Sequence, residues 1–196
     1  MAIRLIVALH GVGSCAADIA PFGQALAGAV GAETIALDGP DPYDMPPPEG
    51  RQWFSISGVT EANRPARVAA ALPALLARID GLGRDRGLSR EAIALAGFSQ
   101  GSIMSLAAVA QGEAFGAVVA AAGRLAAPVR AARPGSPPVL LLHDRQDAMM
   151  PFPLAGEAEA ALRAEGHDVR FVPTDGYGHA IGPKMAEAAV AFLQGL

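Results

Sequence analysis

Residues 92–112 read AIALAGFSQGSIMSLAAVAQG and carry no charged side chain. The first part, residues 92–98, is an apolar run with the length of a buried β-strand, and residues 102–110 have the composition of a buried helix. Between them stands Gly97-Phe98-Ser99-Gln100-Gly101, a G-x-S-x-G pattern. The stretch is long enough to cross a bilayer, but its polar centre favours a strand, a sharp turn and a helix over a membrane span.

The G-x-S-x-G spacing has a mechanical cause. A nucleophile at a sharp strand-to-helix turn is held in a strained backbone conformation, and the residues two before and two after it come close together. A Cβ atom at either place would clash, so glycine is needed at both. The pattern therefore indicates that Ser99 is a nucleophile. The alternative, an ordinary Gly-Ser turn, is disfavoured by the flanking strand and helix.

Strand-like and helix-like segments alternate along the rest of the chain. This alternation predicts an α/β fold with a mostly parallel central sheet of about six strands and helices on both faces. The strand candidates are solid apolar runs, as expected where both faces of a sheet are covered. Pro73 is expected to kink the second helix. We expect strands at residues 3–9, 33–37, 92–98, 117–121, 138–143 and 168–173, and helices at residues 16–30, 61 to about 82, 102–110, 153–165 and 182–193.

Length and composition indicate one folded unit. The chain has 196 residues, of which 52% are hydrophobic, and this composition excludes a disordered protein. The proline-rich residues 39–50 are expected to form a surface loop instead of a boundary between domains. We therefore expect a single domain over residues 1–196.

The charge distribution excludes two classes of partner. The net charge is −4 and the basic residues are scattered, so nothing favours binding to nucleic acid or to an anionic membrane. Cys15 is the only cysteine, which excludes an intramolecular disulfide and fits either a reducing compartment or a chain that is indifferent to redox conditions. The apolar run at residues 5–9 is too short for the core of a signal peptide. We expect a cytoplasmic protein without stable membrane insertion, and its oligomeric state stays open, with a homodimer as one alternative.

A serine nucleophile needs a histidine as its base, and strand order selects among the histidines. Catalytic groups gather at the carboxyl ends of parallel strands. His167 precedes the last predicted strand and lies at the wrong end of the sheet, whereas His179 follows that strand in a glycine-rich loop. His143 also ends a strand, but it precedes the candidate acids, contrary to the chain order Ser, acid, His. We predict His179 as the base.

Three carboxylates lie on loops at the same end of the sheet: Asp144, Asp147 and Asp175. Asp175 is close to His179 in sequence and would have to fold back sharply to meet it. Asp144 abuts the strand directly, whereas Asp147 lies in the loop proper. Spacing alone favours Asp147 only modestly over Asp144.

An acyl-transfer site also needs backbone N–H groups for the developing oxyanion. One donor is usually the amide that follows the nucleophile, here that of Gln100. The second is expected from the loop after the first strand, where Leu9-His10-Gly11-Val12-Gly13 brings the Val12 amide near. A plain tight turn is the alternative for His10-Gly11.

Taken together, these residues resemble the phospholipase/carboxylesterase family of α/β-hydrolases, which includes acyl-protein thioesterases. The resemblance covers nearly the whole chain, and the pattern around Ser99 matches residue for residue. Five segments carry it: Leu9-His10-Gly11-Val12-Gly13, Gly50-Arg51-Gln52-Trp53-Phe54, Gly97-Phe98-Ser99-Gln100-Gly101, His143-Asp144-Arg145-Gln146-Asp147 and Gly178-His179-Ala180-Ile181.

The resemblance implies Ser99 as nucleophile, Asp147 as acid, His179 as base, and the amides of Val12 and Gln100 as oxyanion donors. It therefore raises Asp147 above Asp144 as the acid. One position departs from the family pattern, because Asp144 stands where a glycine usually follows the histidine of the acid loop. A second carboxylate there either competes for the acid role or alters the loop.

The reaction expected from these residues is hydrolysis of an ester or thioester through an acyl-enzyme, with no metal and no organic cofactor. A short-chain carboxylic ester is the default substrate, and a lysophospholipid or an acyl-thioester is the nearest variant. Trp53, Phe54 and Met149 are candidate walls of a substrate pocket. For Trp53-Phe54 a core anchor is an equal alternative, and Met149 has the alternative of gap-filling packing. Acyl transfer or perhydrolysis, and a catalytically silent binding protein, are the competing functions.

Overall fold

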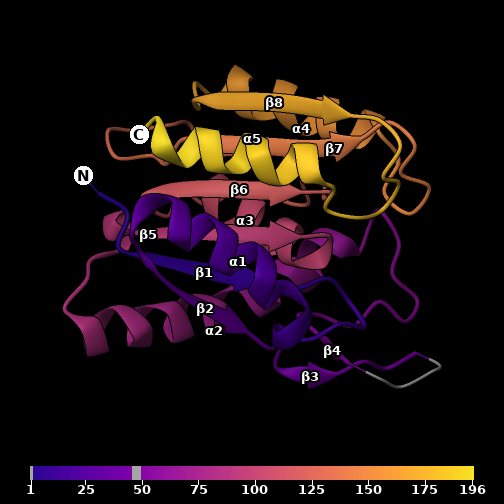
Figure 1. The fold of residues 1–196 in the computed structure, drawn as a ribbon. Helices are drawn as coiled ribbons and strands as arrows, with labels where there is room; N and C mark the ends of the chain where they lie inside the picture. Colours follow the sequence, from indigo (N-terminus) through magenta and orange to yellow (C-terminus); the bar gives the residue numbers. More distant parts are fainter. Residues whose placement is uncertain (1, 46–49) are drawn as a thin grey trace.

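A computed structural model describes residues 2–45 and 50–196. Its centre is a six-stranded parallel sheet in the order β2-β1-β5-β6-β7-β8 (Figure 1). The expected α/β architecture is therefore confirmed, and the strand ends agree with those expected to within two residues. The strands are β1 (Leu5–Leu9), β2 (Glu33–Leu37), β5 (Ile93–Phe98), β6 (Ala117–Ala121), β7 (Val139–Asp144) and β8 (Val169–Thr174).

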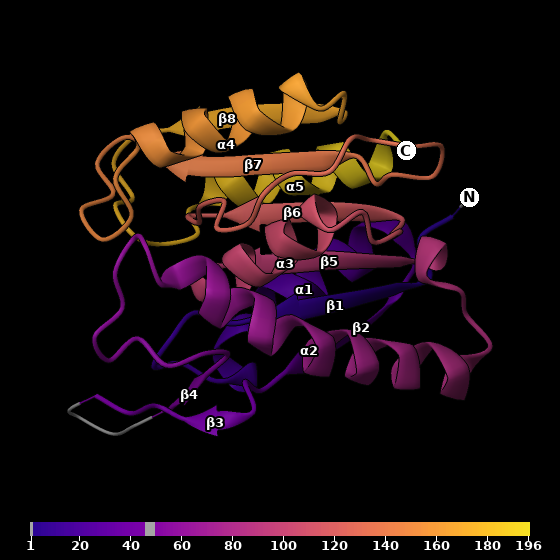
Figure 2. The same ribbon diagram turned by 180° about the vertical axis from the view of Figure 1, so that it is seen from behind.

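Helices cover both faces of this sheet. Figure 1 shows α1 (Ala16–Val30) and α5 (Pro183–Gln194) over one face, and Figure 2 shows α2 (Arg64–Arg86), α3 (Gln100–Ala110) and α4 (Pro153–Ala164) over the other. Among the described residues, no helix has both the length and the hydropathy of a membrane span.

Each face of the sheet has its own apolar core. Side chains alternate between the two faces of a strand, so Val7 and Leu95 pack in the core under α2 and α3, while Ile6 and Ala96 pack in the core under α1 and α5. The solid apolar runs of the central strands thus serve both cores at once.

Two helices differ from their expected bounds by more than one residue. The second helix begins at Arg64, after a turn in which Asn63 and Thr60 exchange hydrogen bonds, and it runs through Pro73 to Arg86. Helix α3 begins at Gln100, directly after Ser99 and earlier than expected, because the nucleophile turn has no separate loop.

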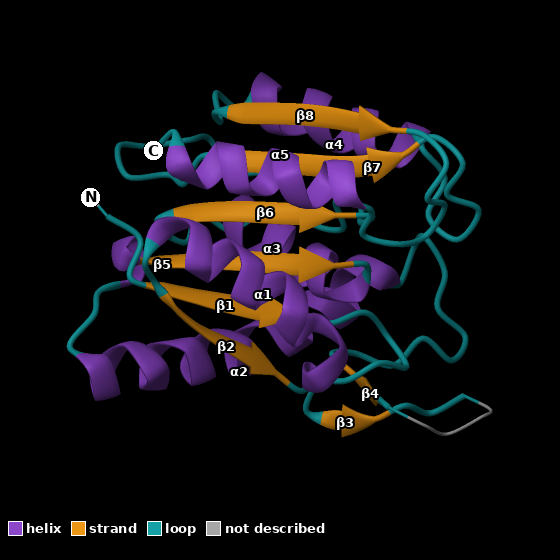
Figure 3. Cartoon of the chain, in the orientation of Figure 1, coloured by secondary structure: helices purple, strands orange, loops and turns teal. Residues whose placement is uncertain are grey.

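One strand of a small antiparallel pair lies within the expected surface loop at residues 39–50, and the other strand directly follows that loop. Strand β3 (Asp41–Pro42) pairs with β4 (Arg51–Gln52), apart from the main sheet (Figure 3). Residues 46–49 of that loop lie outside the described residues. A further short 3-10 turn, Arg90–Ala92, leads into β5. The carboxyl ends of the six parallel strands share one edge, and the loops that leave it carry the candidate site.

Candidate active site

Ser99 occupies a strained turn between β5 and α3, with φ 52° and ψ −114°. Positive φ is uncommon for a residue with a Cβ atom and marks stored backbone strain. A Cβ atom on Gly97 would lie 2.5 Å from the carbonyl oxygen of Gly101, which confirms the expected close approach. A Cβ atom on Gly101 would instead collide with the carbonyl of Leu9 in β1. The second glycine is therefore needed for packing against the neighbouring strand.

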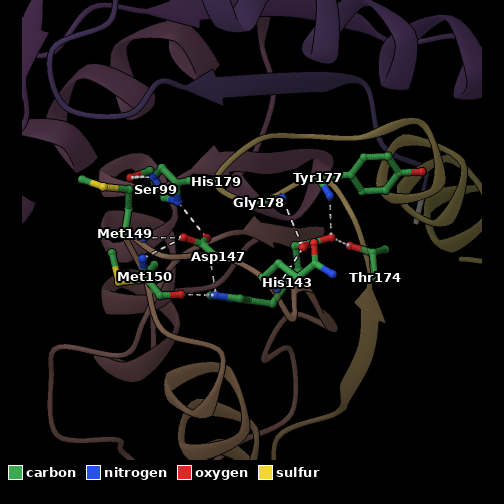
Figure 4. Close-up of polar contacts among 11 residues, drawn as sticks. Ser99, His143, Asp147, Met149, Met150, Thr174, Tyr177, Gly178 and His179 are labelled. Carbon is green, nitrogen blue, oxygen red and sulfur yellow. Dashed lines mark hydrogen bonds and ion pairs between the residues drawn. The ribbon is translucent and has the colours of Figure 1, made fainter.

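Ser99, His179 and Asp147 form a continuous chain of hydrogen bonds (Figure 4). His179 Nε2 lies 2.9 Å from Ser99 Oγ, and His179 Nδ1 lies 2.7 Å from Asp147 Oδ2. Because the carboxylate can only accept, Nδ1 carries the proton and Nε2 is free to accept the serine hydroxyl. The structure thus brings together the three side chains that the sequence singled out as nucleophile, base and acid.

Both oxygens of the Asp147 carboxylate accept hydrogen bonds. Its Oδ1 atom accepts the N–H groups of Met149 at 2.9 Å and of Met150 at 2.8 Å. His143 donates from Nε2 to the Met150 carbonyl at 2.6 Å, and the same nitrogen lies 3.6 Å from Asp147 Oδ2. His143 therefore stabilises the loop that carries Asp147 through its hydrogen bond to Met150, a role that the sequence did not suggest.

Asp144 does not contact His179; its buried carboxylate ties the end of β7 to the loop that carries His179. It accepts the N–H groups of Tyr177 and Gly178, each at 3.1 Å, and the hydroxyl of Thr174 at 3.0 Å. Burial alone would raise its pKa, but these bonds and the N–H of Gln146 outweigh burial and hold the pKa of Asp144 below its usual range. Of the two roles open to this carboxylate, the contacts are those of loop support.

The rejected histidine and acid lie away from this chain of hydrogen bonds. His167 Nε2 lies 3.0 Å from the carbonyl of Arg130, before β8 begins. Asp175 is exposed and pairs with Arg145 at 3.0 Å. Neither side chain joins Ser99.

Two backbone N–H groups near Ser99 remain available for an oxyanion. Among the hydrogen bonds within the described residues, none uses the N–H of Val12 or of Gln100. Gln100 is the first residue of α3, so its N–H lies at the positive end of the helix dipole. The Val12 loop reaches the same place, because a Cβ atom on Gly11 would lie 3.1 Å from Ser99 Cβ.

The neutral imidazole of His10 stabilises the loop that carries Val12. The Gly39 N–H donates to Nε2 at 2.9 Å, so the proton is on Nδ1, which donates to the Gly11 carbonyl at 2.6 Å. Burial lowers the pKa of His10 below its ordinary value, because the charged form loses its hydration.

Trp53 and Phe54 lie in the core, with exposures of 2% and 5%. The Gln100 side chain accepts the Trp53 N–H at 2.8 Å and donates to the Phe54 carbonyl at 2.7 Å. Trp53 Nε1 donates to the His10 carbonyl at 2.9 Å. These are the contacts of a core anchor that joins the Val12 loop to the nucleophile turn. Met149, by contrast, is 74% exposed.

Within residues 2–45 and 50–196, no group of three or more His, Cys, Asp or Glu side chains is arranged to hold a metal ion.

Comparison with known proteins agrees with the fold and shows the family. The family described as Phospholipase/Carboxylesterase matches residues 2–196. Esterase YpfH of Escherichia coli strain K12 is 32% identical over 193 residues, which are 97% of this chain and 82% of that protein. The crystal structure of esterase PE8 superposes with a TM-score of 0.86 at 29% identity, covering 99% of this chain and 93% of PE8.

A more distant solved structure shows the same fold. SOBER1 of Arabidopsis thaliana superposes with a TM-score of 0.78 at 22% identity, covering 98% of each chain. The chain therefore belongs to the phospholipase/carboxylesterase family and is a carboxylic ester hydrolase with the α/β-hydrolase fold.

Proposed function

We propose that the chain hydrolyses short-chain carboxylic esters through an acyl-enzyme on Ser99, with His179 as base and Asp147 as its orienting acid. The observation that carries the proposal is the hydrogen-bonded chain from Ser99 Oγ through His179 to Asp147. A serine hydroxyl is a weak nucleophile until a base takes its proton. The geometry supplies that base at hydrogen-bond distance and a carboxylate that stabilises its charged form.

In the acylation step, Ser99 Oγ attacks the ester carbonyl carbon and its proton passes to His179 Nε2. The carbonyl oxygen becomes an oxyanion and accepts the N–H groups of Val12 and Gln100. The tetrahedral intermediate then collapses, the bond to the leaving group breaks, and His179 protonates the departing oxygen. The products are a free alcohol and Ser99 acylated at Oγ.

Deacylation repeats these steps with water as the nucleophile. His179 takes a proton from water, the same amides hold the second oxyanion, and the acid product leaves with Ser99 restored. A thioester follows the same course with a thiol as leaving group. Paired oxygen and sulfur esters of one acid therefore measure which substrate is preferred.

The proposal is tested by labelling with a fluorophosphonate, followed by peptide mapping of the wild type and of Ser99→Ala. We expect a single labelled peptide that contains Ser99, loss of the label in the variant, and release of p-nitrophenol from p-nitrophenyl butyrate by the wild type only. Label on another residue, or undiminished hydrolysis by Ser99→Ala, would overturn the proposal.

A further inference from the structure

A groove with a volume of about 510 Å³ opens beside His179 and continues over the surfaces of α1 and α5. This volume lies within the range of small-molecule sites, about 300–1,000 Å³. Figure 1 shows α1 and α5 next to each other on the face of the sheet that the groove crosses. The apolar side chains that line it include Ile19, Phe22, Ala25, Phe98, Ile181 and Ala186.

The chemistry of acyl transfer decides which half of an ester this groove faces. In the tetrahedral intermediate, the oxyanion is directed to the N–H groups of Val12 and Gln100. The leaving oxygen must lie within reach of His179 Nε2, because that nitrogen protonates it. The leaving group is therefore on the histidine side of Ser99. The groove reaches that side, since its wall includes His179 and the two residues after it, Ala180 and Ile181. It also touches His10 and Gly11, which precede Val12.

We propose that the α1–α5 groove binds the apolar part of the leaving group, the alcohol or thiol half of the substrate. The proposal rests on Ser99, His179 and the two amides acting as described above. It assigns leaving-group selectivity to α1 and α5, and it leaves the acyl chain to the other side of Ser99.

Charge along the groove narrows the class of leaving group. Asp18 is the carboxylate in its wall, and it accepts hydrogen bonds from Ser14 Oγ at 2.7 Å and from the Cys15 N–H at 3.2 Å. No lysine or arginine of the described residues lines the groove. An apolar leaving group that is neutral or cationic fits this lining, whereas a phosphate-bearing or carboxylate-bearing one would meet an unopposed negative charge.

The test uses two ester series and a variant that fills the groove. One series keeps butyrate and lengthens the alcohol from methyl to octyl, and the other keeps ethanol and lengthens the acid from acetate to octanoate. Ala25 is an exposed wall residue of α1, so Ala25→Phe adds volume to the groove without entering the core. Its neighbour Gln24 is also exposed but lies outside the groove wall, which makes Gln24→Phe the matched control.

We expect Ala25→Phe to lower kcat/KM for octyl butyrate about tenfold or more, the scale by which apolar pockets discriminate between chain lengths. Its kcat/KM for methyl butyrate and its profile over the acyl series should match those of Gln24→Phe. The rate of deacylation should not change, because the leaving group has already departed. A changed acyl profile, or an unchanged alcohol profile, would overturn the proposal.

Asp18→Asn tests the charge separately. Asparagine keeps an acceptor for Ser14 and Cys15 but removes the negative charge. We expect kcat/KM for a butyrate ester of a carboxylate-bearing alcohol to rise a few-fold relative to butyl butyrate, with the gain shrinking as salt is added. No gain would reject the role of Asp18. If the wild type hydrolyses none of these esters, or if Ser99→Ala still hydrolyses them, the proposed catalytic function is rejected instead.

Discussion

Ser99 and His179 are the two side chains whose removal should cost the most activity. In serine hydrolases that use the same constellation, loss of either group lowers kcat by about 10⁶-fold. We therefore expect Ser99→Ala and His179→Ala to hydrolyse p-nitrophenyl butyrate at close to the background rate while unfolding at the wild-type temperature. Asp175→Asn is the control, because Asp175 is exposed and pairs with Arg145 away from Ser99, and it should keep full activity. Substantial kcat in either alanine variant would contradict the assignment.

Changing Asp147 or Asp144 to asparagine should have different effects, the first on activity and the second on stability. Asp147→Asn leaves His179 with the wrong tautomer, so kcat should fall by about 10⁴-fold with little change in stability. Asp144→Asn presents an amide N–H group to donors such as Tyr177 and Gly178, and unmade buried hydrogen bonds cost about 1–3 kcal/mol. Its free energy of unfolding in urea should fall by that amount.

The pair of measurements is decisive because the expected effects differ in kind. If Asp144→Asn proves stable but inactive while Asp147→Asn stays active, the acid has been assigned to the wrong residue. Loss of stability in Asp144→Asn should also grow less distinct in acid. The pKa of Asp144 is depressed in the folded protein, so its contribution is present above about pH 4 and is lost as pH falls through the folded pKa.

Sequence alone predicted the side chains of the candidate site better than their supports. Ser99 stands in a local pattern, and the order of strands is enough to separate His179 from His167. The role of Asp144 depends on partners 30 to 34 positions further along the chain, which no local pattern connects to it. Its departure from the usual glycine was the one available signal. The catalytic roles themselves stay predictions.

At the scale of elements, the loop between β1 and α1 should be sensitive to acid. Below about pH 6.5 the unfolded chain binds a proton on His10, whereas the folded protein keeps His10 neutral to a lower pH. The unfolded state therefore binds more protons, and the free energy of unfolding should decrease as pH falls below about 6.5. Protonation of Nε2 would also break the hydrogen bond from the Gly39 N–H, because both groups would then be donors.

This expectation is checked by urea unfolding between pH 5 and pH 8, with His10→Gln as reference. The difference in stability between wild type and variant should shrink as pH falls, because the variant has no proton to take up. A constant difference over the whole range would show that His10 does not titrate differently in the two states.

Long elements were predictable and short ones were not. The apolar runs of the parallel strands gave their positions closely, and the helical spacing in α2 indicated its existence and its buried face, because burial on two faces or on one stripe leaves a periodic signal. Strands β3 and β4, Asp41–Pro42 and Arg51–Gln52, are too short for any period. The start of α2 was misplaced because Glu61 suits a helix by composition, yet it forms ion pairs with Arg64 and Arg124 from the preceding loop.

For the whole molecule, the two cores share one sheet, so neither should unfold alone. Val7 and Ile6 are neighbours in β1 but belong to opposite cores, and opening either face exposes the same strand. That the chain is a single domain remains a prediction. We expect one cooperative transition in which far-UV circular dichroism and esterase activity are lost together. Two separate transitions would contradict it.

The fluorescence of Trp53 should report on the protonation of the neighbouring His10. It is the only tryptophan, and it is buried. Its indole N–H donates a hydrogen bond to the His10 carbonyl, and the centroids of the Trp53 and His10 rings lie 5.4 Å apart. Its emission should be blue-shifted in the folded protein and quenched when the imidazole gains a proton, a change absent from His10→Gln. One native fluorophore, without any label, thus follows the loop that carries Val12, the proposed oxyanion donor, on the timescale of mixing and in the presence of substrate.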